Sequence, residues 1–111
     1  MNISSHVLDT SIGQPARGIS IALRYRSLNG EWETLDRQVT DDDGRIGKFS
    51  AVSHPPGGTY QLIFETGEYF AASGRQAFYP SVIIEFEVGP DPHYHIPLLL
   101  SPYGYTTYRG S

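Results

Sequence analysis

The chain of 111 residues contains no cysteine. Disulfides, thiolate metal ligands and a cysteine nucleophile are therefore excluded. No apolar run approaches the ~20 residues of a membrane span, and the first residues show neither the basic nor the apolar stretch of a secretory signal. We expect a cytoplasmic protein with one domain, residues 1–111, because a chain of this length supports a single hydrophobic core.

Positive charge is also scarce. Lysine occurs once, at Lys48, and the formal net charge at pH 7 is −4. The sequence has no basic stripe for nucleic acid and no basic amphipathic helix for a membrane surface. We therefore expect neither a nucleic-acid nor a membrane partner.

Acidic residues gather once, in the run Asp41-Asp42-Asp43-Gly44. A calcium loop of the EF-hand type needs spaced ligands and a glutamate six residues after its glycine, where this chain has Ser50. Asp-Gly favours a tight reversal of the backbone. We interpret the run as a turn.

Apolar residues alternate with polar ones along most of the chain, which is typical of half-buried strands. The apolar faces are Ile19, Ile21, Leu23 and Tyr25; Tyr60, Leu62 and Phe64; Val82, Ile84, Phe86 and Val88; and Tyr94, Ile96, Leu98 and Leu100. Turn residues separate these segments. Residues 67–78 break the alternation and favour a short helix ending near Gly74. The pattern predicts an all-β sandwich of two packed sheets with one short helix.

Pro97 lacks a backbone donor and favours an edge position for the strand that contains it, or a place where its amide position faces outward. The last segment, YGYTTYRGS, could pair with that strand after the turn at residues 102–104. Leu99 would then face outward beside His95, which hints at a subunit interface.

Two of the four histidines, His93 and His95, are two residues apart on one predicted strand and face the same side. With a third ligand from elsewhere they could bind zinc. His54, before Pro55, is interpreted as structural or as a surface residue. His6 shares a strand face with Ser4 and Leu8, and could meet His95 across neighbouring strands or across subunits.

Arg45 follows the acidic turn, and Arg109 shares a face with Thr107 and Ser111. Histidines, arginines and a terminal hydroxyl together suit acid/base hydrolysis of an anionic or carbonyl-rich small molecule. Imidazole can activate water near neutral pH, and guanidinium can stabilise a developing oxyanion.

The chain resembles the transthyretin family, and within it the 5-hydroxyisourate hydrolases. The resemblance runs end to end and is carried by SSHVLDTSIGQPARGI at 4–19, DDDGRIG at 41–47, FETGEYF at 64–70, FYPSVIIEF at 78–86 and HYHIPLLLSPYGYTTYRGS at 93–111. The terminal Tyr-Arg-Gly-Ser marks the hydrolase branch, and the hormone-carrying members have lysine at the position of His6.

The resemblance implies a sandwich of two four-stranded sheets with one short helix. It implies a homotetramer, a dimer of dimers, with sites at the dimer–dimer interface and no metal or other cofactor. It also implies hydrolysis of 5-hydroxyisourate in urate catabolism, opening a cyclic amide towards 2-oxo-4-hydroxy-4-carboxy-5-ureidoimidazoline. The implied catalytic residues are His6, Arg45, His95 and Ser111. Tyr108, Arg109, Gly110 and His93 are the implied substrate-binding or supporting residues.

Two alternatives remain open from the sequence. One is a transthyretin-like carrier of an aromatic hormone or similar small molecule. The other is a metal-dependent hydrolase that uses His93 and His95.

Overall fold

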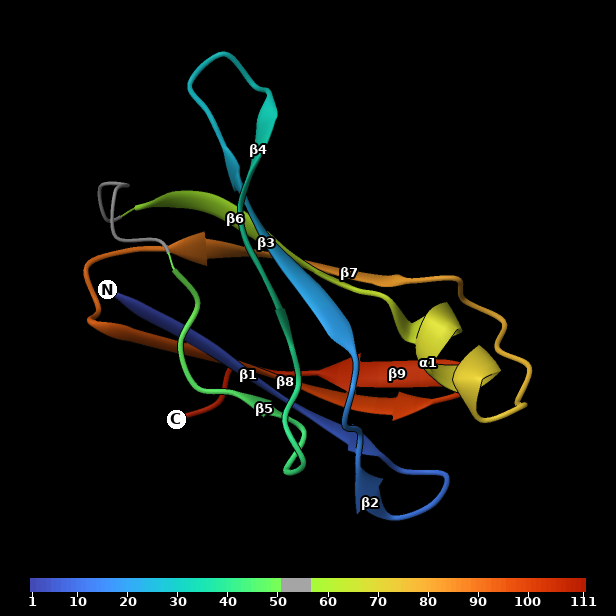
Figure 1. Ribbon diagram of the computed structural model, residues 1–111. Coiled ribbons are helices and arrows are strands. Elements are labelled where there is room, and N and C mark those ends of the chain that lie inside the picture. The colour runs from blue at the N-terminus through green and yellow to red at the C-terminus, as the bar shows by residue number, and fades with distance from the viewer. Residues whose placement is uncertain (51–56) are drawn as a thin grey trace.

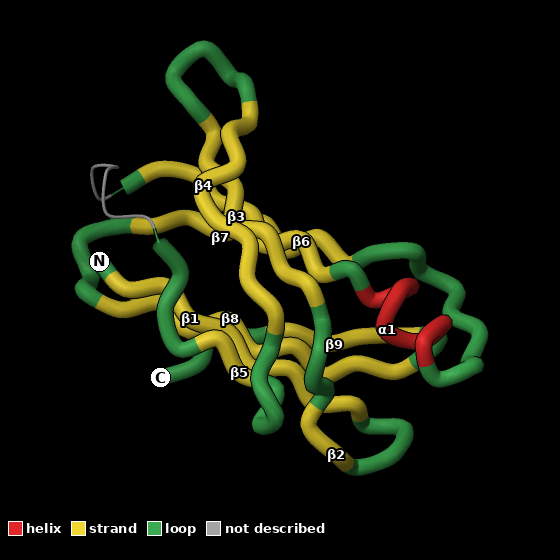
Figure 2. Tube along the Cα trace, viewed as in Figure 1, coloured by secondary structure: helices red, strands yellow, loops and turns green. Residues whose placement is uncertain are grey.

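The computed structural model describes residues 1–50 and 57–111, so His54 and Pro55 lie outside the described residues. Two sheets face each other, with a short helix at the end of the molecule away from both termini (Figures 1 and 2). The elements are β1 (Asn2–Asp9), β2 (Gln14–Pro15), β3 (Ser20–Arg26), β4 (Trp32–Val39), β5 (Arg45–Ile46), β6 (Gly58–Phe64), α1 (Thr66–Ala72), β7 (Val82–Val88), β8 (His93–Ser101) and β9 (Gly104–Thr107).

One sheet has the order β4-β3-β6-β7, and the other has the path β2-β1-β8-β9 with the two-residue strand β5 added against β1. The predicted sandwich with two four-strand paths and one short helix is confirmed. The alternation does not predict β4, because this strand lies half-exposed over its length and shows no clean apolar face.

The core lies between the sheets and contains the apolar faces that the sequence predicts. Its fully buried side chains include Ile21, Leu23, Leu62, Phe64 and Leu98. Each such side chain contributes about 1.5–3 kcal/mol on leaving water. Because strand side chains alternate, the opposite face of β1 and β8 is left for polar chemistry.

The expectation of an edge position for the strand with Pro97 is wrong. β8 lies inside its sheet, parallel to β1 on one side and antiparallel to β9 on the other. The pairing with β9 breaks where Pro97 would need to donate. It is regular up to Leu98 opposite Thr107 and is resumed only by the bridge between His95 and Gly110. Thr107 Oγ1 compensates by donating to the Pro97 carbonyl oxygen at 2.8 Å.

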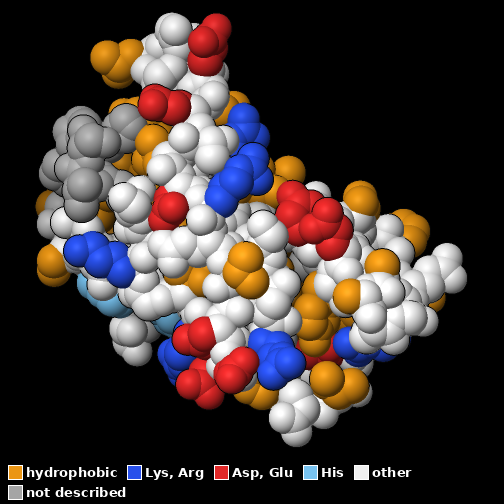
Figure 3. All heavy atoms as spheres, in the orientation of Figure 1, with side chains coloured by type: hydrophobic (Ala, Val, Ile, Leu, Met, Phe, Trp, Pro, Cys, Tyr) orange, Lys and Arg blue, Asp and Glu red, His pale blue; other side chains and the backbone are white. Residues whose placement is uncertain are grey.

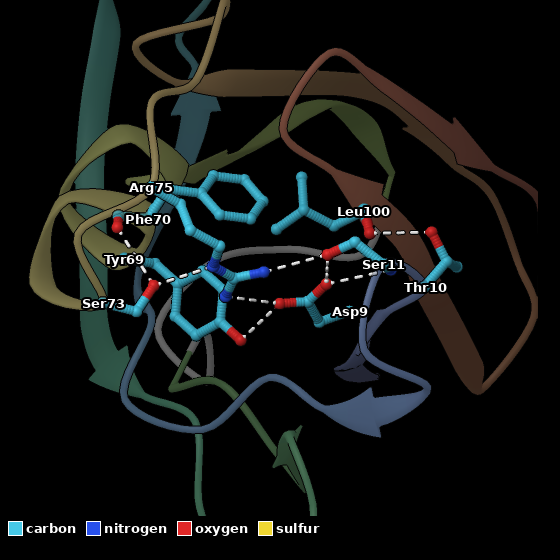
Figure 4. Close-up of polar contacts among 8 residues, drawn as sticks. All are labelled: Asp9, Thr10, Ser11, Tyr69, Phe70, Ser73, Arg75 and Leu100. Atoms are coloured by element: carbon cyan, nitrogen blue, oxygen red, sulfur yellow. Dashed lines mark hydrogen bonds and ion pairs between the residues drawn. The ribbon is translucent and has the colours of Figure 1, made fainter.

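The helix α1 ends in a way that directs Arg75 towards the sheet. Gly74 has φ +71°, a conformation that glycine adopts without strain. The N–H groups of Gly74 and Arg75 donate to the carbonyl oxygens of Ala71 and Phe70, as in a Schellman motif. Arg75 then crosses to Asp9 at the end of β1 (Figure 4).

Asp9 is fully buried, and its carboxylate is satisfied by neighbouring side chains (Figure 4). Arg75 Nη2 donates to Oδ2 at 2.8 Å and the Tyr69 hydroxyl donates to the same atom at 2.7 Å. Burial by itself would raise the pKa of the Asp9 carboxyl, but hydrogen bonds from Ser11, Arg75 and Tyr69 outweigh it and hold the pKa below its ordinary value. This cluster attaches α1 to β1.

No helix among residues 1–50 and 57–111 is long and apolar enough to cross a bilayer.

Replacing Arg75 by alanine removes the charged partner of the buried Asp9 carboxylate. We expect Arg75→Ala to lower the free energy of unfolding by about 1.5–3 kcal/mol, measured by urea denaturation. Arg17→Ala is the control, because Arg17 and Asp42 form an exposed pair 3.4 Å apart, and such pairs contribute little. Equal losses in the two variants would contradict the structural role of the Asp9 cluster.

Candidate active site

The parallel pairing of β1 and β8 brings His6 and His95 together. Ser4 lies opposite His95, and His6 lies opposite Pro97. Because Ser5 and Val7 face the core, the side chains of Ser4 and His6 face outward. The imidazole centroids of His6 and His95 are 6.3 Å apart, with 23° between the ring planes. The sequence leaves convergence across neighbouring strands or across subunits open, and the structure shows the two histidines together on neighbouring strands of one chain.

Arg45 is brought beside His6 by the acidic turn. The carboxylate of Asp41 accepts hydrogen bonds from the backbone N–H of Asp43 at 2.9 Å and of Arg45 at 3.0 Å. The run 41–44 is thus a self-capped turn, as interpreted from the sequence. Arg45 then pairs with His6 as the first residue of β5.

Gly44 is required for this placement. Its φ is +72°, and a Cβ there would collide with the carbonyl oxygen of Val7. The N–H of Val7 donates to the Gly44 carbonyl oxygen at 2.8 Å, so the turn packs directly against β1. Only glycine allows so close an approach of two backbones.

The C-terminal residues after β9 return to the same face. The N–H of Gly110 donates to the His95 carbonyl oxygen at 2.8 Å. A Cβ at position 110 would lie 2.6 Å from His95 Cδ2. Position 110 therefore requires glycine, because the imidazole of His95 leaves no space for a side chain there.

A pocket of about 260 Å³ lies where these segments meet. Its lining residues are Ser4, Ser5, Arg45, Ile46, Gly47, His93, His95 and Ser111. His6 stands beside it, in contact with the ring of His95. Histidine side chains reach the surface next to cationic ones on the side where the termini lie (Figure 3). The structure thus brings His6, Arg45, His95 and Ser111 to one place.

Both imidazoles of this site are kept neutral. Burial lowers the pKa of His6, and the positive charge of Arg45 lowers it further. Burial likewise lowers the pKa of His95, with added effects of His6, Arg45 and His93. At neutral pH both rings are therefore available as proton acceptors or as neutral hydrogen-bond donors.

His93 lies at the rim of the pocket, where its Nδ1 is 3.2 Å from Nδ2 of Asn2. Nδ1 of His95 is 2.7 Å from the Ser4 hydroxyl. Within residues 1–50 and 57–111, no group of three or more His, Cys, Asp or Glu side chains is arranged to hold a metal ion. The described residues thus give the His93–His95 pair no third ligand of these types.

Tyr108 and Arg109 are not brought into this pocket. The guanidinium of Arg109 lies 4.7 Å from the ring centroid of Tyr94 and donates to Asp91 Oδ2 at 3.0 Å. Both residues line a second pocket of about 260 Å³ between the sheets, together with Ile84, Phe86 and Ile96 among others. His95 lines this second pocket as well, so the two pockets share this histidine.

Sequence reasoning assigned no role to Ser4 or Asn2. Both lie on the face of β1 that carries His6, and each contacts a histidine of β8. The available signal was the shared face of Ser4 and His6. The sequence does not reveal the register of β1 against β8, which places Ser4 opposite His95.

Comparison with known proteins identifies the family of the chain. A family model described as Transthyretin: HIUase/Transthyretin family matches residues 3–110. The chain belongs to this family. The family description names both HIUase and transthyretin, so the individual relatives matter for function.

One relative is the 5-hydroxyisourate hydrolase of Salmonella dublin, which is 43% identical over 110 residues, covering 98% of this chain and 80% of the relative. The solved structure of Klebsiella pneumoniae 5-hydroxyisourate hydrolase has a TM-score of 0.88 and 41% identity, with each chain covered completely. Sea bream transthyretin, solved in complex with thyroxine, has a TM-score of 0.91 but 29% identity, with 97% of this chain and 93% of the other covered. Both solved structures share the fold of this chain, whereas its sequence is nearer to the two hydrolases than to this transthyretin.

The proximity of Arg45 predicts a measurable effect on both histidines. We expect NMR titration to give pKa values for His6 and His95 below the ordinary 6.5, and Arg45→Gln to raise both. Arg24→Gln is the control, because Arg24 lies over Trp32 on the other sheet. Histidine pKa values that respond equally to both substitutions would contradict the placement of Arg45.

Proposed function

We propose that this protein hydrolyses 5-hydroxyisourate in urate catabolism, opening its cyclic amide towards 2-oxo-4-hydroxy-4-carboxy-5-ureidoimidazoline. The observation that carries the proposal is the convergence of His6, Arg45, His95 and Ser111 at one pocket. Support comes from relatives named as 5-hydroxyisourate hydrolases that are 43–47% identical over nearly the whole chain. A neutral imidazole pair beside a fixed cation suits water attack on a carbonyl of an anionic ring.

The reaction needs one water molecule and a proton transfer. The water oxygen forms a bond to the ring carbonyl carbon, the carbon–nitrogen bond breaks, and the leaving nitrogen receives a proton. His6 and His95 position the water, take its proton and return a proton to the nitrogen. Arg45 binds the oxygens of the substrate and stabilises the negative charge that develops on them.

The C-terminal residues complete the site in this proposal. Ser111 orients the substrate or water through its hydroxyl or its terminal carboxylate. Gly110 lies against the ring of His95. His93 supports the rim of the pocket, and Tyr108 and Arg109 hold the C-terminal segment in place from the second pocket.

The assembly is part of the proposal. We expect a homotetramer, a dimer of dimers, with sites at the dimer–dimer interface. The pocket opens on the outer face of its sheet, where Leu99 is only partly buried in the single chain. The strands β7 and β9 are the last in their sheets and are available to extend them. The assignment of residues 1–111 to a single domain and the cytoplasmic location stay predictions.

A carrier function is the alternative, because the fold overlays on a thyroxine-bound transthyretin with a TM-score of 0.91. His6 and the last two residues of the terminal Tyr-Arg-Gly-Ser argue against it. Ser111 lines the polar pocket, His6 lies beside it, and Gly110 packs against the ring of His95. A titration with thyroxine separates the two. Micromolar binding without hydrolysis would favour the carrier.

Removing one imidazole tests the enzymatic role. Freshly made 5-hydroxyisourate, generated from urate with urate oxidase, decays measurably in the ultraviolet. We expect wild-type protein to accelerate this decay with or without a chelator, and His95→Ala to lower kcat by about 10²–10⁴-fold. Light scattering is expected to show a tetramer for both.

Three results would contradict this account. Decay with wild-type protein at the spontaneous rate removes the enzyme proposal. An intact His95→Ala tetramer with unchanged turnover removes the role of His95. Activity lost to the chelator and restored by zinc would favour the metal-dependent alternative.

The tight packing of Gly110 gives a second test. Gly110→Ala forces the His95 ring from its position, so we expect kcat to fall by roughly 10–100-fold while the urea midpoint changes little. Gly104→Ala is the matched control, since the nearest atom to a Cβ there is 3.8 Å away. Equal activities of the two variants would show that the position of the ring does not matter.

A further inference from the structure

The hydroxyl of Ser4 makes one polar contact that the proposed chemistry does not yet use. Ser4 is 6% exposed, and its Oγ lies 2.7 Å from Nδ1 of His95. The two residues face each other in the β1–β8 register, so regular strand pairing on both sides fixes this contact. The contact engages Nδ1 of a site imidazole, while Nε2 has no hydrogen-bond partner among the described residues.

The direction of this hydrogen bond follows from the surroundings of Ser4. In the described part of the chain, Nδ1 of His95 is the one hydrogen-bond partner of the Ser4 hydroxyl. The neighbouring Ser5 hydroxyl donates elsewhere, to the Ile96 carbonyl oxygen at 2.8 Å. A buried hydroxyl that does not donate loses its hydration without a compensating hydrogen bond. Donation from Ser4 to Nδ1 avoids this loss and places the imidazole proton on Nε2.

The His95 ring is also restrained on its other side. Gly110 packs so closely that a Cβ there would lie 2.6 Å from Cδ2 and 3.2 Å from Cγ. The ring is thus held by a hydrogen bond at Nδ1 and by the C-terminal backbone at its Cδ2 edge. Two separate contacts therefore restrain the orientation of the ring.

We propose that Ser4 is a positioning residue that donates to Nδ1 and holds His95 as a neutral donor at Nε2. Resting on the proposed hydrolysis, this divides the roles of the two histidines. His6 takes the proton from water as the oxygen–carbon bond forms, and gives it to the ring nitrogen as the carbon–nitrogen bond breaks. His95 keeps its proton and donates a hydrogen bond to the carbonyl oxygen, where negative charge develops.

The test reads the imidazole directly by ¹⁵N NMR of the full chain at pH 8, where the ring is neutral. His95→Asn identifies the His95 signals by their loss. We expect a protonated Nε2 and an unprotonated Nδ1 with the shift of a hydrogen-bonded acceptor in wild type. In Ser4→Ala, we expect the ¹⁵N chemical shift of His95 Nδ1 to move towards the value of an unprotonated imidazole nitrogen that accepts no hydrogen bond.

Thr10→Val is the matched control. Thr10 Oγ1 also joins the β1 segment to β8, donating to the Leu100 carbonyl oxygen at 3.0 Å, but far from the pocket. We expect it to leave the Nδ1 shift of His95 unchanged. A proton on Nδ1 in wild type, or the same Nδ1 shift in wild type and Ser4→Ala, overturns the inference.

Kinetics complete the test. We expect Ser4→Ala to lower kcat by about 10-fold or more with a smaller change in KM. A misoriented donor loses more of its stabilisation of the transition state than of its contribution to substrate binding. An unchanged kcat beside an active wild type overturns the positioning role. A wild type without hydrolysis removes the proposed function instead, and the NMR comparison still decides whether Ser4 sets the tautomer.

Discussion

The parallel pairing of β1 with β8 is the constraint on which the rest of the structure depends. It joins segments 91 residues apart in the sequence, as the contacts of Ser4 with His95 and of Asn2 with His93 show. Parallel neighbours cannot be joined by a tight turn and need a crossover connection. Here this connection comprises most of the chain. Once the register is set, β5 adds to the free edge of β1 and β9 adds to β8. Arg45 and the C-terminus then reach the face that carries both histidines.

The same two strands separate stability from chemistry. Their inner face contributes Val7, Leu98 and Leu100 to the core, and their outer face presents Ser4, His6 and His95. The buried Asp9, at the end of β1, is attached to α1 through Arg75. Substitutions on the outer face can therefore change the proton chemistry without opening the core, which is why variants there are informative about function.

The sequence predicts those features that depend on local alternation. The buried faces of β3, β6 and β8, the short helix and the acidic turn all follow from side-chain period and turn residues. The shared face of His6 and His95 follows in the same way once the two strands are neighbours. The roles of Arg45 and Ser111 came from the family resemblance, because nothing local in the sequence links them to a histidine.

Features that depend on long-range pairing could not be predicted. Pro97 favours an edge strand, yet β8 is internal because the proline disturbs only the pairing towards β9. The contacts of Arg109 with Tyr94 and Asp91 depend on register and packing between different segments. The contact of Ser4 with His95 depends on them in the same way. Alternation places a residue on a face but does not say what lies opposite it.

The most direct test of the central claim is a double-mutant cycle on His6 and His95, with kcat/KM for 5-hydroxyisourate as the readout. If the pairing of β1 and β8 makes the two imidazoles act as one catalytic unit, the two substitutions by asparagine are strongly non-additive, and the double variant is little worse than the poorer single one. Additive losses, with each imidazole contributing independently of the other, would contradict the account.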